Sequence, residues 1–180
     1  TNRVLDTFQS TGRLPEQVNR HPKDVAQDLA NQLHPGTYLS VLAYTTPSRL
    51  FETAVRRLRQ ALMTRHRVAT TFGYGPRYLH STGQLHKGGP KTGVFLELVD
   101  RMSPDTAIPG KPFSFGTLAQ AQAVGDLASL RAHDRHAIRV QLGRDQAATV
   151  NAITAALIPT SSSRARRPVT SKKHPKRARR

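Results

Sequence analysis

From residue 37 onward, short apolar runs alternate with longer amphipathic stretches. Four of the runs have the length and the apolar content of strands that are buried on both faces, and they cover residues 38–44, 68–72, 93–99 and 136–142. Because strands that alternate with helices along a chain form parallel sheets, this order predicts an α/β fold. We expect a small, mostly parallel sheet of about four strands with flanking helices.

Amphipathic helices are predicted between and after these strands. In the first, apolar side chains recur every three or four positions from Phe51 to Leu62, and the helix is expected to run to about residue 66. Thr46 followed by Pro47 is typical of the start of such a helix. Two further helices are predicted, over residues 117–131 and 145–157.

The chain divides into three parts on this pattern. Residues 1–36 are predicted to form a helical lead-in and linker, with short helices over 2–10 and 22–33. Residues 37–158 form the predicted α/β domain. Residues 159–180 are rich in Ser, Arg, Lys and Pro and contain no aromatic residue, a composition typical of a disordered tail.

The formal net charge is +17, from 28 Lys and Arg against 11 Asp and Glu, and it is distributed unevenly. Nine of the basic residues and no acidic residue lie within residues 159–180. A strongly basic segment favours a polyanionic partner, so nucleic acid is a candidate partner of the tail. A solvated chain end with no specific partner explains the same composition.

Other features of the composition narrow the class of protein. The chain has no cysteine, which excludes a disulfide framework and a thiolate zinc site. Its longest apolar runs are far shorter than the roughly 20 residues that cross a bilayer, and its amino end lacks the pattern of a signal peptide. We expect a soluble, cytoplasmic protein with no membrane partner. We expect no metal and no cofactor.

The segment between the second and third predicted strands, residues 73–93, is the densest in candidate chemistry. Its six glycines allow the backbone to approach a ligand closely, and exposed NH groups in such turns can hold an anion. Basic, imidazole, hydroxyl and amide side chains accompany the glycines. The candidate substrate-binding residues are Arg77, His80, Ser81, Thr82 and Gln84, and the candidate catalytic residues are His86 and Lys87.

This set of side chains suits a phosphorylated polyol, which is anionic at one end and carries hydroxyls along its length. A histidine exchanges protons near neutral pH, which acid/base chemistry on such a substrate requires. Glycine and proline at this density are equally typical of a sharp connector without a ligand. His80 and His86 are six residues apart, so they do not share a helix face as a pair of zinc ligands would.

Two long stretches of the chain resemble a known family. VATTFGYGPRYLHSTGQLHKGGPKTGVFLEL and, further on, IPGKPFSFGTLAQAQAVGDLASLRAHDRHAIRVQLG are similar to the C-terminal region of the glucose-6-phosphate isomerase module in bacterial bifunctional transaldolase/glucose-6-phosphate isomerases. HSTGQLHKGG, residues 80–89, is the most specific motif, and the resemblance covers about residues 1–157. It implies a SIS-like, three-layer fold. It also implies the metal-free isomerisation of glucose 6-phosphate and fructose 6-phosphate.

The resemblance implies in addition that this chain is only part of the isomerase. In the family, the glutamate that carries a proton between neighbouring carbons and a lysine-bearing segment lie upstream of where this chain begins, and neither motif occurs in residues 1–180. His86 follows a Gln-Leu pair and is similar to the histidine that assists ring opening in ordinary glucose-6-phosphate isomerases. We therefore expect an upstream isomerase half or a homo-oligomer partner to complete the site.

Two residues depart from the family pattern, and two functions other than the isomerase are considered below. Lys91 stands where relatives usually have asparagine, and Glu97 stands where they usually have glutamine. Glu97 would be a substitute base only at an exposed strand end. Either a charge-tolerant edge of the sheet or a salt bridge with a nearby arginine is favoured for it. The alternative function is a non-catalytic isomerase-like module whose basic tail binds nucleic acid or a ribosomal surface. Transaldolase activity is disfavoured, because the sequence shows no eight repeated βα units.

Overall fold

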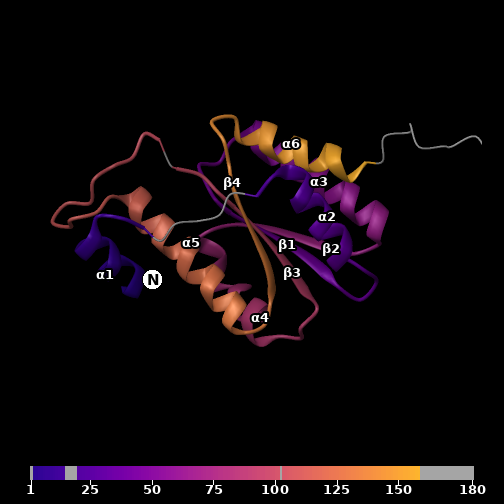
Figure 1. Cartoon of the computed structure of the whole chain (residues 1–180), viewed down its shortest axis with the longest axis horizontal. Coiled ribbons are helices and arrows are strands. Elements are labelled where there is room, and N and C mark those ends of the chain that lie inside the picture. Colours follow the sequence, from indigo (N-terminus) through magenta and orange to yellow (C-terminus); the bar gives the residue numbers. More distant parts are fainter. Residues whose placement is uncertain (1, 15–19, 102, 159–180) are drawn as a thin grey trace, which may run out of the picture.

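A computed structural model describes residues 2–14, 20–101 and 103–158 of the chain (Figure 1). Its centre is a four-stranded sheet in the order β2-β1-β3-β4, and each pair of neighbouring strands is parallel. The strands are β1 (Tyr38–Tyr44), β2 (Ala69–Tyr74), β3 (Gly93–Val99) and β4 (His136–Gln141). The predicted α/β fold with a sheet of four strands is confirmed, and this sheet is parallel throughout.

The two central strands explain why the sequence shows apolar runs without alternation. All seven residues of β3 are buried, and so are six of the seven residues of β1. Strands that are covered by helices on both faces have no solvent side on which polar residues could alternate. The outer strand β2 differs, because exposed residues alternate along its first half.

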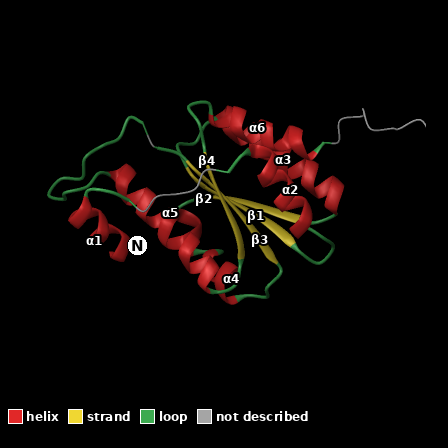
Figure 2. Ribbon diagram, viewed as in Figure 1, coloured by secondary structure: helices red, strands yellow, loops and turns green. Residues whose placement is uncertain are grey.

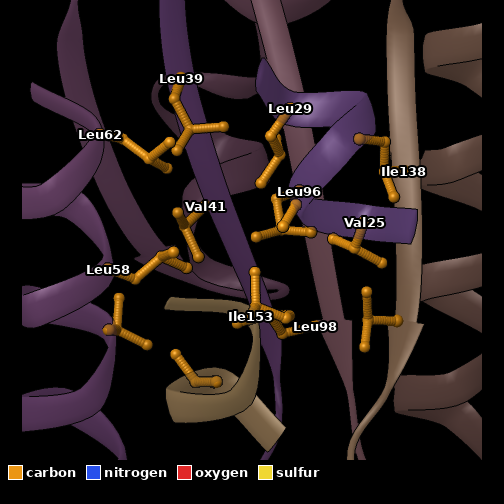
Figure 3. Packing of buried hydrophobic residues seen from close by; sticks show 14 of the residues in the cluster. Val25, Leu29, Leu39, Val41, Leu58, Leu62, Leu96, Leu98, Ile138 and Ile153 are labelled. Carbon is orange, nitrogen blue, oxygen red and sulfur yellow. The ribbon is translucent and has the colours of Figure 1, made fainter. Parts of the chain in front are cut away.

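One face of the sheet is covered by three helices, α2 (Pro22–Gln32), α3 (Arg49–His66) and α6 (Gln146–Leu157) (Figure 2). The main hydrophobic cluster fills the space between these helices and the strands. In Figure 3, Val41 and Leu96 of the central strands lie close to Leu58 of α3 and Ile153 of α6. This face therefore holds most of the core.

The opposite face of the sheet carries α1 (Asn2–Thr11), the 3-10 helix η1 (Arg77–His80), α4 (Gly83–Gly88) and α5 (Phe115–Ala132). A second hydrophobic cluster joins Leu42 and Tyr44 of β1 to Phe95 of β3 and Leu130 of α5. Helix α1 packs against α5. The glycine-rich segment, which includes η1 and α4, is therefore part of the layer on this face.

Two predicted helix starts are corrected by the structure. Helix α3 begins at Arg49, where the hydroxyl of Ser48 accepts a hydrogen bond from the backbone NH of Phe51 at 3.2 Å. Ser48 is the cap because its side chain reaches that NH, whereas Thr46 lies two residues before it. Helix α5 begins two residues before the predicted position, and Ser114 caps it in the same way. Asp145 caps α6, at the predicted start.

The lead-in, residues 1–36, contains two helices as predicted, and one of them belongs to the core. Val25 and Leu29 of α2 are fully buried in the main cluster, so α2 packs as part of the α/β domain. The predicted tail, residues 159–180, lies outside the described residues. Within the described part of the chain, none of the helices has the length and apolar character needed to cross a membrane.

In each outer strand, one backbone carbonyl accepts a hydrogen bond from the side chain of an arginine on a neighbouring helix. Arg59 of α3 donates to the carbonyl oxygen of Thr70 in β2 at 2.9 Å, and Arg131 of α5 donates to that of Ala137 in β4 at 3.3 Å. Unpaired carbonyls on an outer strand invite pairing with another chain. These two guanidinium groups occupy such positions, which disfavours extension of the sheet from one molecule to the next.

Candidate functional site

The glycine-rich segment folds back over the sheet because two of its glycines leave room for aromatic rings. A Cβ atom on Gly75 would lie 2.4 Å from Cζ of Tyr44, and one on Gly73 would lie 3.1 Å from Cβ of Tyr78. The chain can therefore turn sharply after β2 and lay η1 and α4 onto the face of β1 and β2. Ten residues of the segment are helical.

Beneath this segment lies a pocket of about 470 Å³. Four of the seven candidate residues line it, together with two hydroxyl groups that the sequence analysis did not single out: Arg77, Ser81, Thr82 and His86, with Ser40 of β1 and Thr71 of β2. The volume is in the range of small-molecule sites. The pocket lies over the sheet face beside the outer strand β2.

His86 forms the inner wall of this pocket and is only 4 % exposed. Its Nε2 lies 3.4 Å from the hydroxyl of Ser40, and that hydroxyl accepts a hydrogen bond from Thr71 at 2.9 Å. The rings of Tyr78 and Phe95 pack against the imidazole. Burial lowers the pKa of His86 below its ordinary value. The negative charge of Asp126 opposes this shift only in part, and the positive charge of Lys87 adds to it.

The imidazole of His86 is therefore neutral at pH 7, so one ring nitrogen can accept a proton and the other can donate one. Its Nδ1 is buried and has no hydrogen-bond partner among the described residues. A buried polar atom without a partner costs free energy. The geometry suits proton exchange with a polar ligand in the pocket.

Arg77 supplies the positive charge of the pocket. It follows the carboxyl end of β2, is exposed, and places its guanidinium carbon 5.9 Å from the centre of the Tyr74 ring. Among the described residues, no other Lys or Arg lines this pocket, and no Asp or Glu does. A guanidinium group presents paired donors to a phosphate or carboxylate, so an anionic group fits at this end of the pocket.

The remaining three candidates do not line the pocket. His80 and Gln84 are exposed on the outer side of the segment. Lys87 points toward α5, where its ammonium group forms an ion pair with Asp126 at 2.7 Å. The side chain of Lys87 is 24 % exposed and that of Asp126 is 2 % exposed, so the pair is largely removed from water.

Asp126 is the functional candidate that sequence reasoning missed. Its second carboxylate oxygen accepts a hydrogen bond from the hydroxyl of Tyr78 at 2.6 Å. One buried carboxylate thus fixes both η1 and α4, the two helices that carry the residues of the pocket. Arg135 adds a further restraint, because it donates to the backbone carbonyls of Lys87 and Gly89. The one signal in the sequence that could have pointed to Asp126 is that it is the single acidic residue of the helix predicted over residues 117–131.

Glu97 is buried in the middle of the sheet and does not reach the pocket. It is 1 % exposed and pairs with Arg139 of β4 at 3.2 Å, which is one of the two alternatives favoured from the sequence. Burial raises the pKa of Glu97 to about 8, and the nearby Arg139 opposes this only in part. Burial likewise lowers the pKa of Arg139. Glu97 is therefore a structural residue in this arrangement, and Lys91 pairs with Asp134 on the surface.

Comparisons with known proteins give a fold and no family. No protein-family model and no curated protein sequence matches the chain. A solved structure described as a hypothetical protein from Thermus thermophilus is similar, with a TM-score of 0.61 over 76 % of this chain and 16 % sequence identity. This chain spans only 39 % of the length of that structure. At this identity the likeness shows that the chain has the α/β fold of part of that protein.

Proposed function

We propose that this chain is the C-terminal domain of a cytoplasmic glucose-6-phosphate isomerase and that it binds the sugar phosphate in the pocket beneath η1 and α4. The observation that carries the proposal is the convergence of Arg77, Ser81, Thr82 and His86 on one pocket. The guanidinium group of Arg77 binds the phosphate. The hydroxyls of the pocket bind those of the sugar.

His86 carries the acid/base step that opens the sugar ring in this proposal. Opening transfers the proton of the C1 hydroxyl to a base, while the ring oxygen gains a proton as its bond to C1 breaks. A neutral imidazole can take the first proton and return one to the ring oxygen, so no net charge remains on the protein. The desolvated position of His86 and its nearness to the Ser40 hydroxyl support this role.

The second step of the isomerisation needs a base to move a proton between C2 and C1 of the open sugar. No carboxylate lines the pocket within the described residues, and Glu97 is held by Arg139. In this proposal, the base comes from an upstream isomerase half that covers the exposed mouth of the pocket. The domain by itself then binds the sugar phosphate and opens its ring, but it does not isomerise it.

Two measurements on the chain test the proposal. Calorimetric titration should show that glucose 6-phosphate binds and that glucose, which lacks the phosphate, binds at least about tenfold more weakly. Arg77→Gln should weaken glucose 6-phosphate binding by about 10- to 100-fold, because a charge-assisted hydrogen bond is lost. Arg57→Gln removes the same charge from the exposed side of α3 and is the matched control. Equal losses in both variants would mean that net charge alone attracts the ligand.

Ring opening is measured separately from binding. Exchange NMR reports the rate at which the α and β anomers of glucose 6-phosphate interconvert, and each interconversion passes through the open chain. The wild-type chain should accelerate this exchange, and His86→Gln should abolish the acceleration while ligand still binds. Binding without any acceleration of exchange would reject the catalytic role of His86.

The alternative function rests on residues 159–180 alone. Their nine basic and no acidic side chains favour a polyanion, so the chain would then be a non-catalytic isomerase-like module that holds nucleic acid or a ribosomal surface. Salt-sensitive binding to RNA or DNA, with no affinity for glucose 6-phosphate, would favour this function over the isomerase.

A further inference from the structure

Positive charge is concentrated on α3 and the segment that follows it. Without the nine basic residues of the predicted tail, the chain carries a net charge of +8, and residues 49–77 account for +6 of it. This range holds seven arginines, no lysine and one acidic residue, Glu52. Helix α3 packs beside the outer strand β2, in the layer that Figure 1 shows with α2 and α6. One edge of the folded domain is therefore strongly basic.

Three of these arginines lie on the solvent side of α3. Arg49, Arg56 and Arg57 are exposed, whereas Leu58 and Leu62, on the opposite side of the helix, are fully buried. Arg49 and Arg56 are seven residues apart, so they lie on the same side of the helix, two turns and about 10 Å from each other. These three side chains form the arginine face of α3.

No carboxylate neutralises the arginine face within the described part of the chain. None of its three arginines takes part in an ion pair there. Glu52 instead accepts a hydrogen bond from the hydroxyl of Tyr74 at 3.2 Å. Arg67, directly after the helix, is exposed as well, so exposed guanidinium groups occur along the whole length of α3, over about 27 Å.

We propose that the arginine face of α3 binds the phosphodiester backbone of a nucleic acid. Cations that extend over this length suit a linear polyanion, whereas a compact anion would contact one or two of them. Guanidinium groups present paired donors that match the oxygens of a phosphate. Because the contact is to the backbone, it is independent of the base sequence.

An anionic membrane is the other extended surface of negative charge, and α3 does not suit it. A helix that lies in a membrane surface inserts its apolar face among the lipids. The apolar face of α3 is part of the core, where Phe51, Leu58 and Leu62 are fully buried. Its exposed large apolar residues, Leu50 and Met63, lie near opposite ends of the helix, so they form no continuous apolar strip.

This contact is distinct from the two functions considered above. The sugar-phosphate pocket lies on the other face of the sheet, and its Arg77 is not part of the arginine face. The alternative function places the nucleic acid on residues 159–180, whereas this inference places it on the folded domain. The inference therefore stands or falls independently of the isomerase proposal.

The salt dependence of binding measures how many phosphates the protein contacts. Fluorescence anisotropy on the full chain, with a labelled single-stranded RNA and with a labelled DNA duplex, gives the slope of log K against log salt concentration. Arg49→Gln/Arg56→Gln/Arg57→Gln should reduce this slope by about 2 on the RNA and about 3 on the duplex, since each lost phosphate contact removes about 0.7 or 0.9. Contributions to the slope add, so binding by the tail does not hide the loss.

The matched control is Arg3→Gln/Arg101→Gln/Arg144→Gln, which removes the same charge from exposed positions outside α3. Its slope should stay within about 0.5 of the wild-type slope. Equal reductions in the two triple variants would overturn the inference, because net charge alone would then act. An unchanged slope in the α3 variant would also overturn it and would leave the tail as the contact.

The choice of ligand is tested with the same proteins. Binding to either backbone supports the inference, and the tighter of the two identifies RNA or DNA as the source. Vesicles of phosphatidylglycerol and phosphatidylcholine are the comparison. A chain that binds these vesicles through the arginine face and binds no nucleic acid would overturn the inference.

A cross-linking measurement keeps every arginine in place. The chain has no cysteine, so Gln60→Cys introduces a single thiol for a photo-cross-linker. Gln60 is exposed on α3, one turn after Arg56. Labelled RNA or DNA should be joined to this variant and not to Ala128→Cys, which places the thiol at an exposed position of α5, on the opposite face of the sheet. Equal cross-linking from the two positions would overturn the inference.

Discussion

The ion pair between Lys87 and Asp126 offers a test that separates a structural lysine from a catalytic one. Lys87 belongs to the motif that carries the family resemblance, yet its ammonium group lies 2.7 Å from a carboxylate of α5 and does not line the pocket. Removal of either partner leaves the other without its counter-charge. The two losses should differ, because the side chain of Asp126 is 2 % exposed and that of Lys87 is 24 % exposed.

The magnitudes follow from this difference in burial. Lys87→Met leaves a carboxylate that water cannot reach, and the free energy of unfolding should fall by about 3–5 kcal/mol, as when one partner of a buried pair is removed. Asp126→Asn leaves an ammonium group that turns partly into water, and the amide oxygen still accepts from Tyr78. We expect that loss to be about 1–3 kcal/mol. In the double variant no charge is left unpaired, so the combined loss should fall short of the sum by about 1–3 kcal/mol.

Equilibrium unfolding in urea measures all four proteins, and calorimetry with glucose 6-phosphate follows on those that fold. If Lys87 has a structural role, the double variant keeps the affinity of the wild type within about twofold, since its pocket is intact. Additive losses of stability would refute the ion pair as the reason for the effect. A stable double variant that no longer binds the sugar phosphate would show that Lys87 contacts the ligand.

Three further predictions follow from the described contacts and from the composition of the tail. Glu97→Gln should flatten the pH dependence of stability. A carboxyl whose pKa rises to about 8 on folding loses stability as pH rises from its ordinary 4.5 toward that value, so over this range the free energy of unfolding of the wild type should fall more than that of the variant. Thermal unfolding of both proteins across this range checks the slope, and a wild-type stability that rises with pH contradicts it. Gly75→Ala should lower the free energy of unfolding by at least about 2 kcal/mol, since the new Cβ would lie 2.4 Å from Cζ of Tyr44, and an unchanged urea midpoint would contradict that overlap. Deletion of residues 159–180 should abolish salt-sensitive binding to RNA in a filter assay, if the basic tail is what binds, and should leave the affinity for glucose 6-phosphate unchanged.

Much of the fold could be predicted from local patterns. A strand that is buried on both faces has no polar alternation, so the runs at β1 and β3 were visible as continuous apolar segments. The long helix α3 was visible because Phe51, Leu58 and Leu62 recur on one face. The residue at which α3 begins could not be predicted, because two nearby residues, Thr46 and Ser48, are both good caps. Only the path of the chain decides which of the two hydroxyls meets the free NH groups of the first turn.

The site was predictable only where its residues are close in sequence. Arg77, Ser81, Thr82 and His86 could be grouped, because a glycine-rich segment between two strands must turn back on itself. Nothing local distinguished these four from His80 and Gln84, which belong to the same motif and face outward. The direction in which each side chain points depends on the turns of η1 and α4, which form only against the sheet.

The amino-acid sequence by itself determined the class of fold, the order of its elements, the uneven charge and the segment in which the pocket occurs, because these depend on hydrophobic period and composition along a few residues. Only the tertiary structure decided which atoms meet across long separations in the chain. Ser40 comes 46 positions before His86 and lies beside it, and Asp126, on a helix that follows β3, holds Lys87 away from the pocket. Such pairings are set by strand order and helix packing, which leave no pattern at either residue alone.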